Sequence, residues 1–191
     1  MIKRESLLSL EAYARQRKEY RAKIIEHKKR RTVHLGEHVT LQFEDEILMR
    51  YQVQEMLHAE RIFEEEGIQG ELEAYNPLVP DGSNWKATMF IEYPDVEQRR
   101  RMLETLKGIE RRVWVQVDEL ERVYGIADED LERETEEKTA AVHFLRFELS
   151  AAMRERLSKD AKLTVGVDHP KYSAAVELAP EVRAALAKDL H

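Results

Sequence analysis

The residues best suited to chemistry lie close together, in residues 46–66, a segment that the sequence predicts to be helical. Glu55 and His58 follow the Glu-x-x-His spacing, which in di-iron proteins places both ligands on one helix face. A di-iron bundle needs a second such pair, and none of the other six histidines has a glutamate three residues before it. A di-iron bundle protein is therefore excluded. A mononuclear metal site stays open, with His58, His143 and His169 as candidate ligands.

A second group on the same segment suggests binding rather than catalysis. Gln54, Glu55 and Arg61 place an amide, a carboxylate and a guanidinium within two helical turns. Such a stripe can line a small-molecule pocket between a helix and a sheet. It can equally hold loops and sheet ends by hydrogen bonds, and both interpretations stay open.

The sequence contains none of the common motifs for nucleophilic catalysis. There is no cysteine, which excludes thiolate nucleophiles, disulfides and cysteine-held zinc or iron–sulfur clusters. No P-loop, dinucleotide-binding glycine pattern or nucleophile elbow is present. Asp168 precedes His169 and could orient it as a general base, although a turn at Pro170 explains the same residues. No catalytic residue or cofactor is assigned, and an enzymatic role is left open.

The element that must position the candidate residues is the helix over 46–66. Asp45 is expected to cap its start, and Gly67 and Gly70 are expected to end or break it. Apolar residues recur every three to four positions, which predicts one buried stripe. Its members are Leu48, Met49, Val53, Met56, Ala59 and Phe63.

The remaining chain alternates strand patterns with shorter helices. Period-two alternation and turn residues predict strands at 32–43 (a hairpin around Gly36), 86–93, 111–117, 120–124, 141–149, 163–167 and 173–178. We expect one α+β domain over residues 1–191, with a curved, mostly antiparallel sheet or partial barrel of about six to eight strands and packed helices.

Charge is spread unevenly along the chain. Residues 1–31 hold eleven Lys and Arg against four Glu, a net charge of +7. The net charge of the whole chain is −7, so the other 160 residues carry −14. This predicts a basic N-terminal helix that packs on the body or extends from it. Attraction within the molecule or between subunits would explain the pattern, so a homo-oligomer is left open. An arm that docks on an acidic partner or on RNA is the alternative, although the acidic total disfavours nucleic acid.

Apolar runs are short throughout the chain. None approaches the length of a membrane span, and no apolar signal segment follows the first residues. These features predict a cytoplasmic protein without membrane segments.

Six sequence blocks resemble an uncharacterised bacterial domain-of-unknown-function family, numbered 3501. They are SLEAYARQRKEYRAKIIEHKKRR, QVQEMLHAERI, EAYNPLVP, ATMFIEYP, HFLRFEL and GVDHPKY, in that order. The resemblance implies no activity, but members are often encoded near rubrerythrin-like and iron–sulfur proteins, which implies a redox protein as partner. The leading hypothesis is a non-catalytic accessory or interaction protein linked to redox or peroxide-stress systems. The alternative is a metal- or small-molecule-binding protein around Glu55, Arg61 and nearby histidines.

Overall fold

The structure, a computed structural model, describes residues 1–191 and divides them into two compact units. Residues 1–30 and 44–80 form one, here called the helical unit, and residues 31–43 and 81–191 form the other, the β unit. The sequence alone predicts a single domain over residues 1–191.

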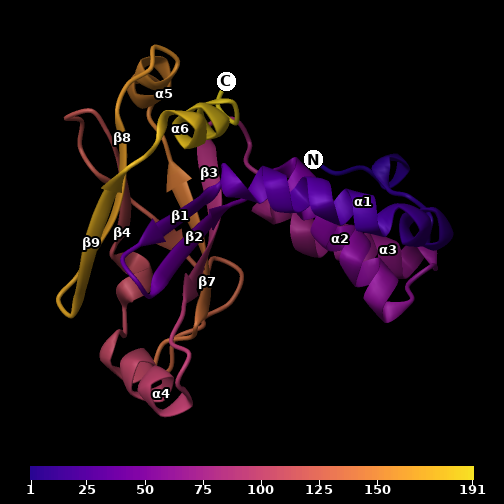
Figure 1. Cartoon of the computed structure of the whole chain (residues 1–191), viewed down its shortest axis with the longest axis horizontal. Helices are drawn as coiled ribbons and strands as arrows, with labels where there is room; N and C mark the ends of the chain where they lie inside the picture. The colour runs from indigo at the N-terminus through magenta and orange to yellow at the C-terminus, as the bar shows by residue number, and fades with distance from the viewer. The chain divides into compact units, whose positions relative to one another are not determined.

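Three helices build the helical unit and lie side by side in it (Figure 1). They are α1 (Leu10–Lys29), α2 (Glu46–Glu60) and α3 (Glu65–Tyr75), with short 3-10 turns η1 (Arg4–Ser6) and η2 (Asn76–Leu78). Ser9 and Asp45 cap α1 and α2, because their side chains accept hydrogen bonds from backbone N–H groups of the first turn. The buried apolar side chains between the helices are Ile2, Leu7, Ile24, Leu48, Met49, Val53, Leu57, Ile68 and Leu72.

The end of α2 differs from the prediction. The helix stops at Glu60 because Arg61 adopts the left-handed conformation with φ 58°, and the N–H of Ile62 bonds back to the Leu57 carbonyl. Gly67 lies inside the next helix instead of ending this one. The predicted buried stripe is therefore wrong at its far end, since Phe63 is 73% exposed.

The β unit contains two antiparallel sheets, which confirms an α+β fold but replaces the single curved sheet or partial barrel with two separate layers. The first has the order β1-β2-β3-β7-β6 and the second the order β5-β4-β8-β9. The strands are β1 (Thr32–Leu35), β2 (Val39–Phe43), β3 (Asn84–Ile91), β4 (Val113–Val117), β5 (Val123–Tyr124), β6 (Ile126–Ala127), β7 (Val142–Glu148), β8 (Leu163–His169) and β9 (Tyr172–Glu177).

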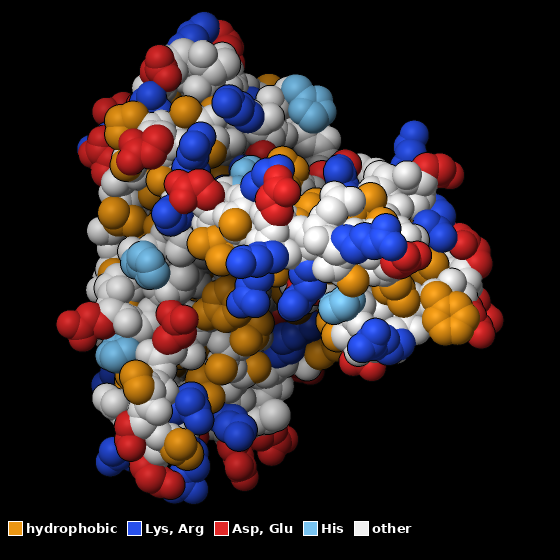
Figure 2. Space-filling model, turned by 45° about the vertical axis from the view of Figure 1, so that its right-hand side comes forward, with side chains coloured by type: hydrophobic (Ala, Val, Ile, Leu, Met, Phe, Trp, Pro, Cys, Tyr) orange, Lys and Arg blue, Asp and Glu red, His pale blue; other side chains and the backbone are white.

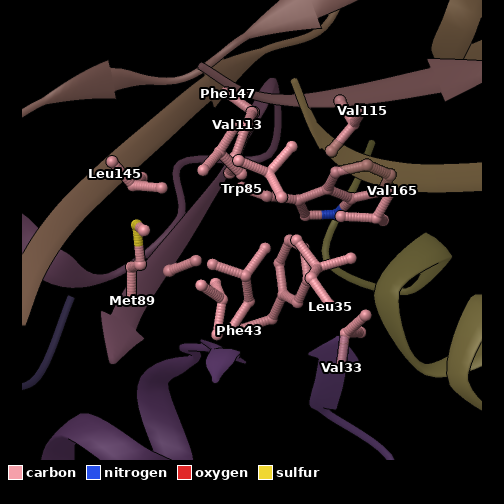
Figure 3. Close-up of a cluster of buried hydrophobic side chains, with 14 of the residues drawn as sticks. Val33, Leu35, Phe43, Trp85, Met89, Val113, Val115, Leu145, Phe147 and Val165 are labelled. Carbon is pink, nitrogen blue, oxygen red and sulfur yellow. The ribbon is translucent and has the colours of Figure 1, made fainter. Parts of the chain in front are cut away.

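Apolar side chains from the two sheets meet in the core of the β unit (Figure 3). Strand alternation explains this, because every second residue of β4 and β7 points to the same side. Trp85 is fully buried there, and its indole N–H donates to the Leu186 carbonyl at 2.9 Å. The inward face of β7 consists of His143, Leu145 and Phe147.

Three helices and one turn complete the β unit. They are α4 (Val96–Thr105), η3 (Ile109–Arg111), α5 (Ala151–Leu157) and α6 (Pro180–Ala187). Within this unit, α5 and α6 lie at one end of the sheets and α4 at the other (Figure 1). No helix of the chain is both long and apolar enough to span a membrane.

Candidate functional site

Glu55 is the centre of a hydrogen-bonded network between α1 and α2. Its carboxylate accepts from the Tyr13 hydroxyl at 2.5 Å and from two nitrogens of Arg17 at 2.8 Å each. Hydrogen bonding from Arg17 lowers the pKa of Glu55. Tyr13 is fully buried, and this burial, together with the hydrogen bond to Glu55, raises its pKa. The carboxylate is thus occupied by partners from its own unit.

The other two predicted residues near Glu55 face different surroundings. The His58 ring meets the Tyr13 ring edge-on, with 5.9 Å between centroids, and makes no hydrogen bond to Glu55. Arg61 is exposed and ends α2. The structure therefore brings Glu55 and His58 to the same aromatic neighbour, whereas Arg61 belongs to the helix end.

Gln54 holds the start of the chain against α2. It is 1% exposed, and its amide accepts from the Leu8 N–H at 2.6 Å and donates to the Leu8 carbonyl at 3.3 Å. Asn76 makes the same pair of contacts to Ile2, at 2.8 and 3.1 Å. A side-chain amide has one oxygen and one NH₂ group, so it can bond both the backbone N–H and the backbone carbonyl of a single residue. Gln54 and Asn76 therefore fix the N-terminal segment at Leu8 and at Ile2.

His143 is fully buried and lies in a separate network of the β unit. Its Nδ1 is 2.6 Å from Asp128, and its Nε2 is 2.8 Å from the Thr139 hydroxyl and 3.0 Å from the Ala140 carbonyl. The Thr139 hydroxyl in turn donates to Glu110 at 3.2 Å, and Glu110 is only 2% exposed. One imidazole thus joins two carboxylates, the second, buried one through a hydroxyl.

These partners hold the His143 ring in one orientation. The Ala140 carbonyl only accepts, so Nε2 is the donor to it. The Asp128 carboxylate also accepts from the Phe144 N–H and from Arg133, which fixes it against Nδ1. The order carboxylate, imidazole, hydroxyl is that of a nucleophilic triad, but Thr139 is 1% exposed and its hydroxyl points to a carboxylate. The arrangement therefore holds the segment before β7 in place.

His169 is bound entirely to backbone. Its Nε2 is 2.9 Å from the Lys107 carbonyl, and its Nδ1 accepts from the Lys171 N–H at 3.1 Å. His58 belongs to the helical unit and both His143 and His169 to the β unit. In residues 1–191, no group of three or more His, Asp or Glu side chains is arranged to hold a metal ion.

A shallow groove of about 600 Å³ in the β unit offers open polar atoms beside apolar side chains. The His38 ring stacks on Tyr93 with 3.9 Å between centroids, and its Nδ1 donates to the Glu92 carbonyl. Its Nε2 is 3.9 Å from Glu37, beyond hydrogen-bond distance. Phe90, Pro94, Arg99 and Val142 also line the groove. A ligand could pair with Nε2 while it covers the apolar side chains.

Sequence reasoning missed most partners of the predicted residues. A signal existed for Tyr13 and Arg17, which lie four positions apart on one face of α1. Asp128 carried no such signal, because it begins an acidic run that is typical of exposed loops. His38 lies beside the turn at Gly36, a position typical of exposed histidines, and only the fold brings Tyr93 against it.

Comparisons with known proteins place the chain among proteins without an assigned activity. The profile of a family described as "Protein of unknown function (DUF3501)" matches residues 1–190. A crystal structure of a protein of unknown function from Burkholderia pseudomallei K96243 is 57% identical, with a TM-score of 0.95 over 100% of this chain and 99% of that chain. The search of curated proteins found no match.

Proposed function

The chain belongs to the DUF3501 family, and we propose that it acts as a non-catalytic interaction protein. One observation carries the proposal: four of the six polar residues that the sequence singled out for chemistry are bound by hydrogen bonds within the chain. Gln54 and Glu55 bond to the N-terminal segment and α1, while His143 and His169 bond inside the β unit. A residue held this way stabilises the fold, and function is left to the surface.

The surface of α1 supports contact with an acidic partner. The helix has seven Lys and Arg against three Glu. Lys18 and Arg21 are exposed, whereas neighbouring Arg15 and Lys23 pair with glutamates of the same helix. We propose a redox protein as this partner, as the gene neighbourhood of the family implies.

Capture of the native partner tests the proposal. The full chain is purified from its source organism after chemical cross-linking, as wild type, as Lys18→Glu with Arg21→Glu, and as Glu55→Gln. We expect the double charge reversal to reduce the captured partner, because like charges now meet, and Glu55→Gln to retain it. Deletion of residues 1–31 is unsuitable, since Ile2, Leu7 and Ile24 belong to the core of the helical unit. Loss of the partner with Glu55→Gln, in a protein with unchanged circular dichroism, would contradict the proposal.

The groove beside His38 favours a second candidate, binding of a small molecule. Its stacked ring pair and open Nε2 combine apolar area with an oriented acceptor. A thermal-shift screen of metabolites tests it, with His38→Ala compared with His34→Ala, whose side chain is exposed on β1. A ligand that stabilises wild type and the His34 variant but not the His38 variant would support it.

A further inference from the structure

Phe63 is an unusual surface residue of the helical unit. At 73% exposure it is the most exposed aromatic side chain among the large apolar residues at the surface. The helix end explains its direction, because Ile62 turns inward against α3, where Gly67 leaves room for it. A Cβ at Gly67 would lie 2.6 Å from Ile62. The chain thus places one apolar side chain inside and presents the next one to water.

The exposed ring borders a cavity of the same unit. This cavity has a volume of about 300 Å³. Its apolar lining beside Phe63 consists of Leu8, Leu10, Leu57, Ile62 and Ile68, and its polar lining of Arg4, Ser9 and Glu11. The volume is at the lower end of the range for ligand sites, which suits a few side chains rather than a large molecule. An apolar hollow with an exposed aromatic ring at its edge is typical of a binding surface.

The segment that carries Phe63, at the edge of the cavity, is acidic. Residues 60–73 contain six Glu and one Arg, a net charge of −5. Glu65 pairs with Arg4, but Glu60, Glu64 and Glu66 are exposed and have no cationic partner. On the helical unit, Figure 2 shows hydrophobic side chains at the surface among acidic and basic ones. The surface therefore complements an apolar stripe flanked by positive charge.

We propose that this cavity binds a basic amphipathic helix of a partner protein, with Phe63 as the anchor. The inference rests on the proposed interaction function and names a surface and a class of partner. The helical unit has no strand edge with which an extended peptide could pair, whereas apolar side chains at helical spacing can enter the cavity. Glu60, Glu64 and Glu66 then face Lys and Arg of the bound helix.

A model peptide provides the test on the full chain. The probe is a labelled 20-residue peptide of Leu and Lys with Leu on one helical face. A peptide of the same composition with scrambled order and one with Glu in place of Lys are the controls. Fluorescence anisotropy should show binding of the first peptide to wild type and an affinity about tenfold lower for Phe63→Ser. Glu64→Gln with Glu66→Gln should weaken binding and reduce its salt dependence.

Val96→Ser is the matched control, because Val96 is also exposed, at 63%, but lies on α4 of the β unit. It should bind the peptide as wild type does. Equal affinity of wild type and Phe63→Ser, equal affinity for the scrambled peptide, or no binding to wild type would overturn the inference. Native partner capture separates the two proposals: if wild type and Phe63→Ser capture the same partner equally, only this docking surface is rejected.

Discussion

The helical unit and the β unit each contain a network of carboxylates, a ring and hydrogen-bond donors, but they differ in access to water. The Glu55 side chain is 21% exposed and its partner Arg17 38%. The His143 side chain is fully buried, and its carboxylate partners Asp128 and Glu110 are 9% and 2% exposed. The two networks therefore use similar residue types, but the one around Glu55 is in contact with water and the one around His143 is mostly shielded from it.

This difference determines what each network contributes. Water screens the Arg17–Glu55 pair, and exposed ion pairs contribute at most about 1 kcal/mol to stability. The His143 network is less accessible to water, and its imidazole is fully buried, so removal of one partner leaves buried polar groups without compensation. We therefore expect the β unit to be far more sensitive to substitution in its network than the helical unit.

The largest effect is expected for His143→Ala. The substitution leaves Asp128 and the buried Thr139–Glu110 pair without the imidazole, which should lower the free energy of unfolding by about 3–5 kcal/mol. Urea denaturation followed by tryptophan fluorescence measures it, because both tryptophans, Trp85 and Trp114, lie in the β unit. His34→Ala, at an exposed position, should change stability by less than about 0.5 kcal/mol. Equal effects of the two substitutions would break the comparison.

A smaller effect is expected for Gln54→Ala in the helical unit. The loss of its amide leaves the N–H and carbonyl of Leu8 without partners, which should cost about 1–3 kcal/mol. Circular dichroism at 222 nm during urea denaturation follows it, since α1, α2 and α3 are the three longest helices. Gln52→Ala on the same helix is the control. If both variants unfold alike, the amide does not hold the N-terminal segment.

The smallest expected effect is a change in how the stability of the helical unit depends on pH. Because Arg17 lowers the pKa of Glu55 in the folded chain, the unfolded chain binds that proton more readily. The resulting stabilisation is complete above the pKa of the unfolded carboxyl and is lost as pH falls through the folded pKa. Urea midpoints between about pH 6 and about pH 3 should therefore fall less steeply for Glu55→Gln than for wild type. Parallel pH profiles would show that Arg17 does not hold the carboxylate.

The sequence predicted local structure better than arrangement. Alternation located most strands, and Ser9, Asp45 and Ser150 cap helices where side-chain oxygens precede apolar patterns. The end of α2 was misplaced because a left-handed Arg61 has no sequence signal comparable to a glycine. The division into two sheets depends on long-range strand pairing, such as β3 with β7, which local periodicity does not encode.

The sequence placed the candidate residues on elements but did not indicate their partners. Helical spacing put Gln54 and Glu55 on α2 without showing what they contact. The segment that meets Gln54, residues 2–8, lies more than 40 positions away, and no spacing rule connects the two. The sequence therefore left both a pocket and a structural network open, whereas the hydrogen bonds of the structure favour the network.

The most direct test of this account is a double-mutant cycle between Tyr13 and Glu55. Tyr13→Phe, Glu55→Gln and the double variant are compared by urea denaturation with circular dichroism at 222 nm. If the carboxylate is held within the chain, the two substitutions should be coupled by about 1 kcal/mol or more. Additive effects, with a coupling energy near zero, would show that Glu55 is available to a ligand and would contradict the account.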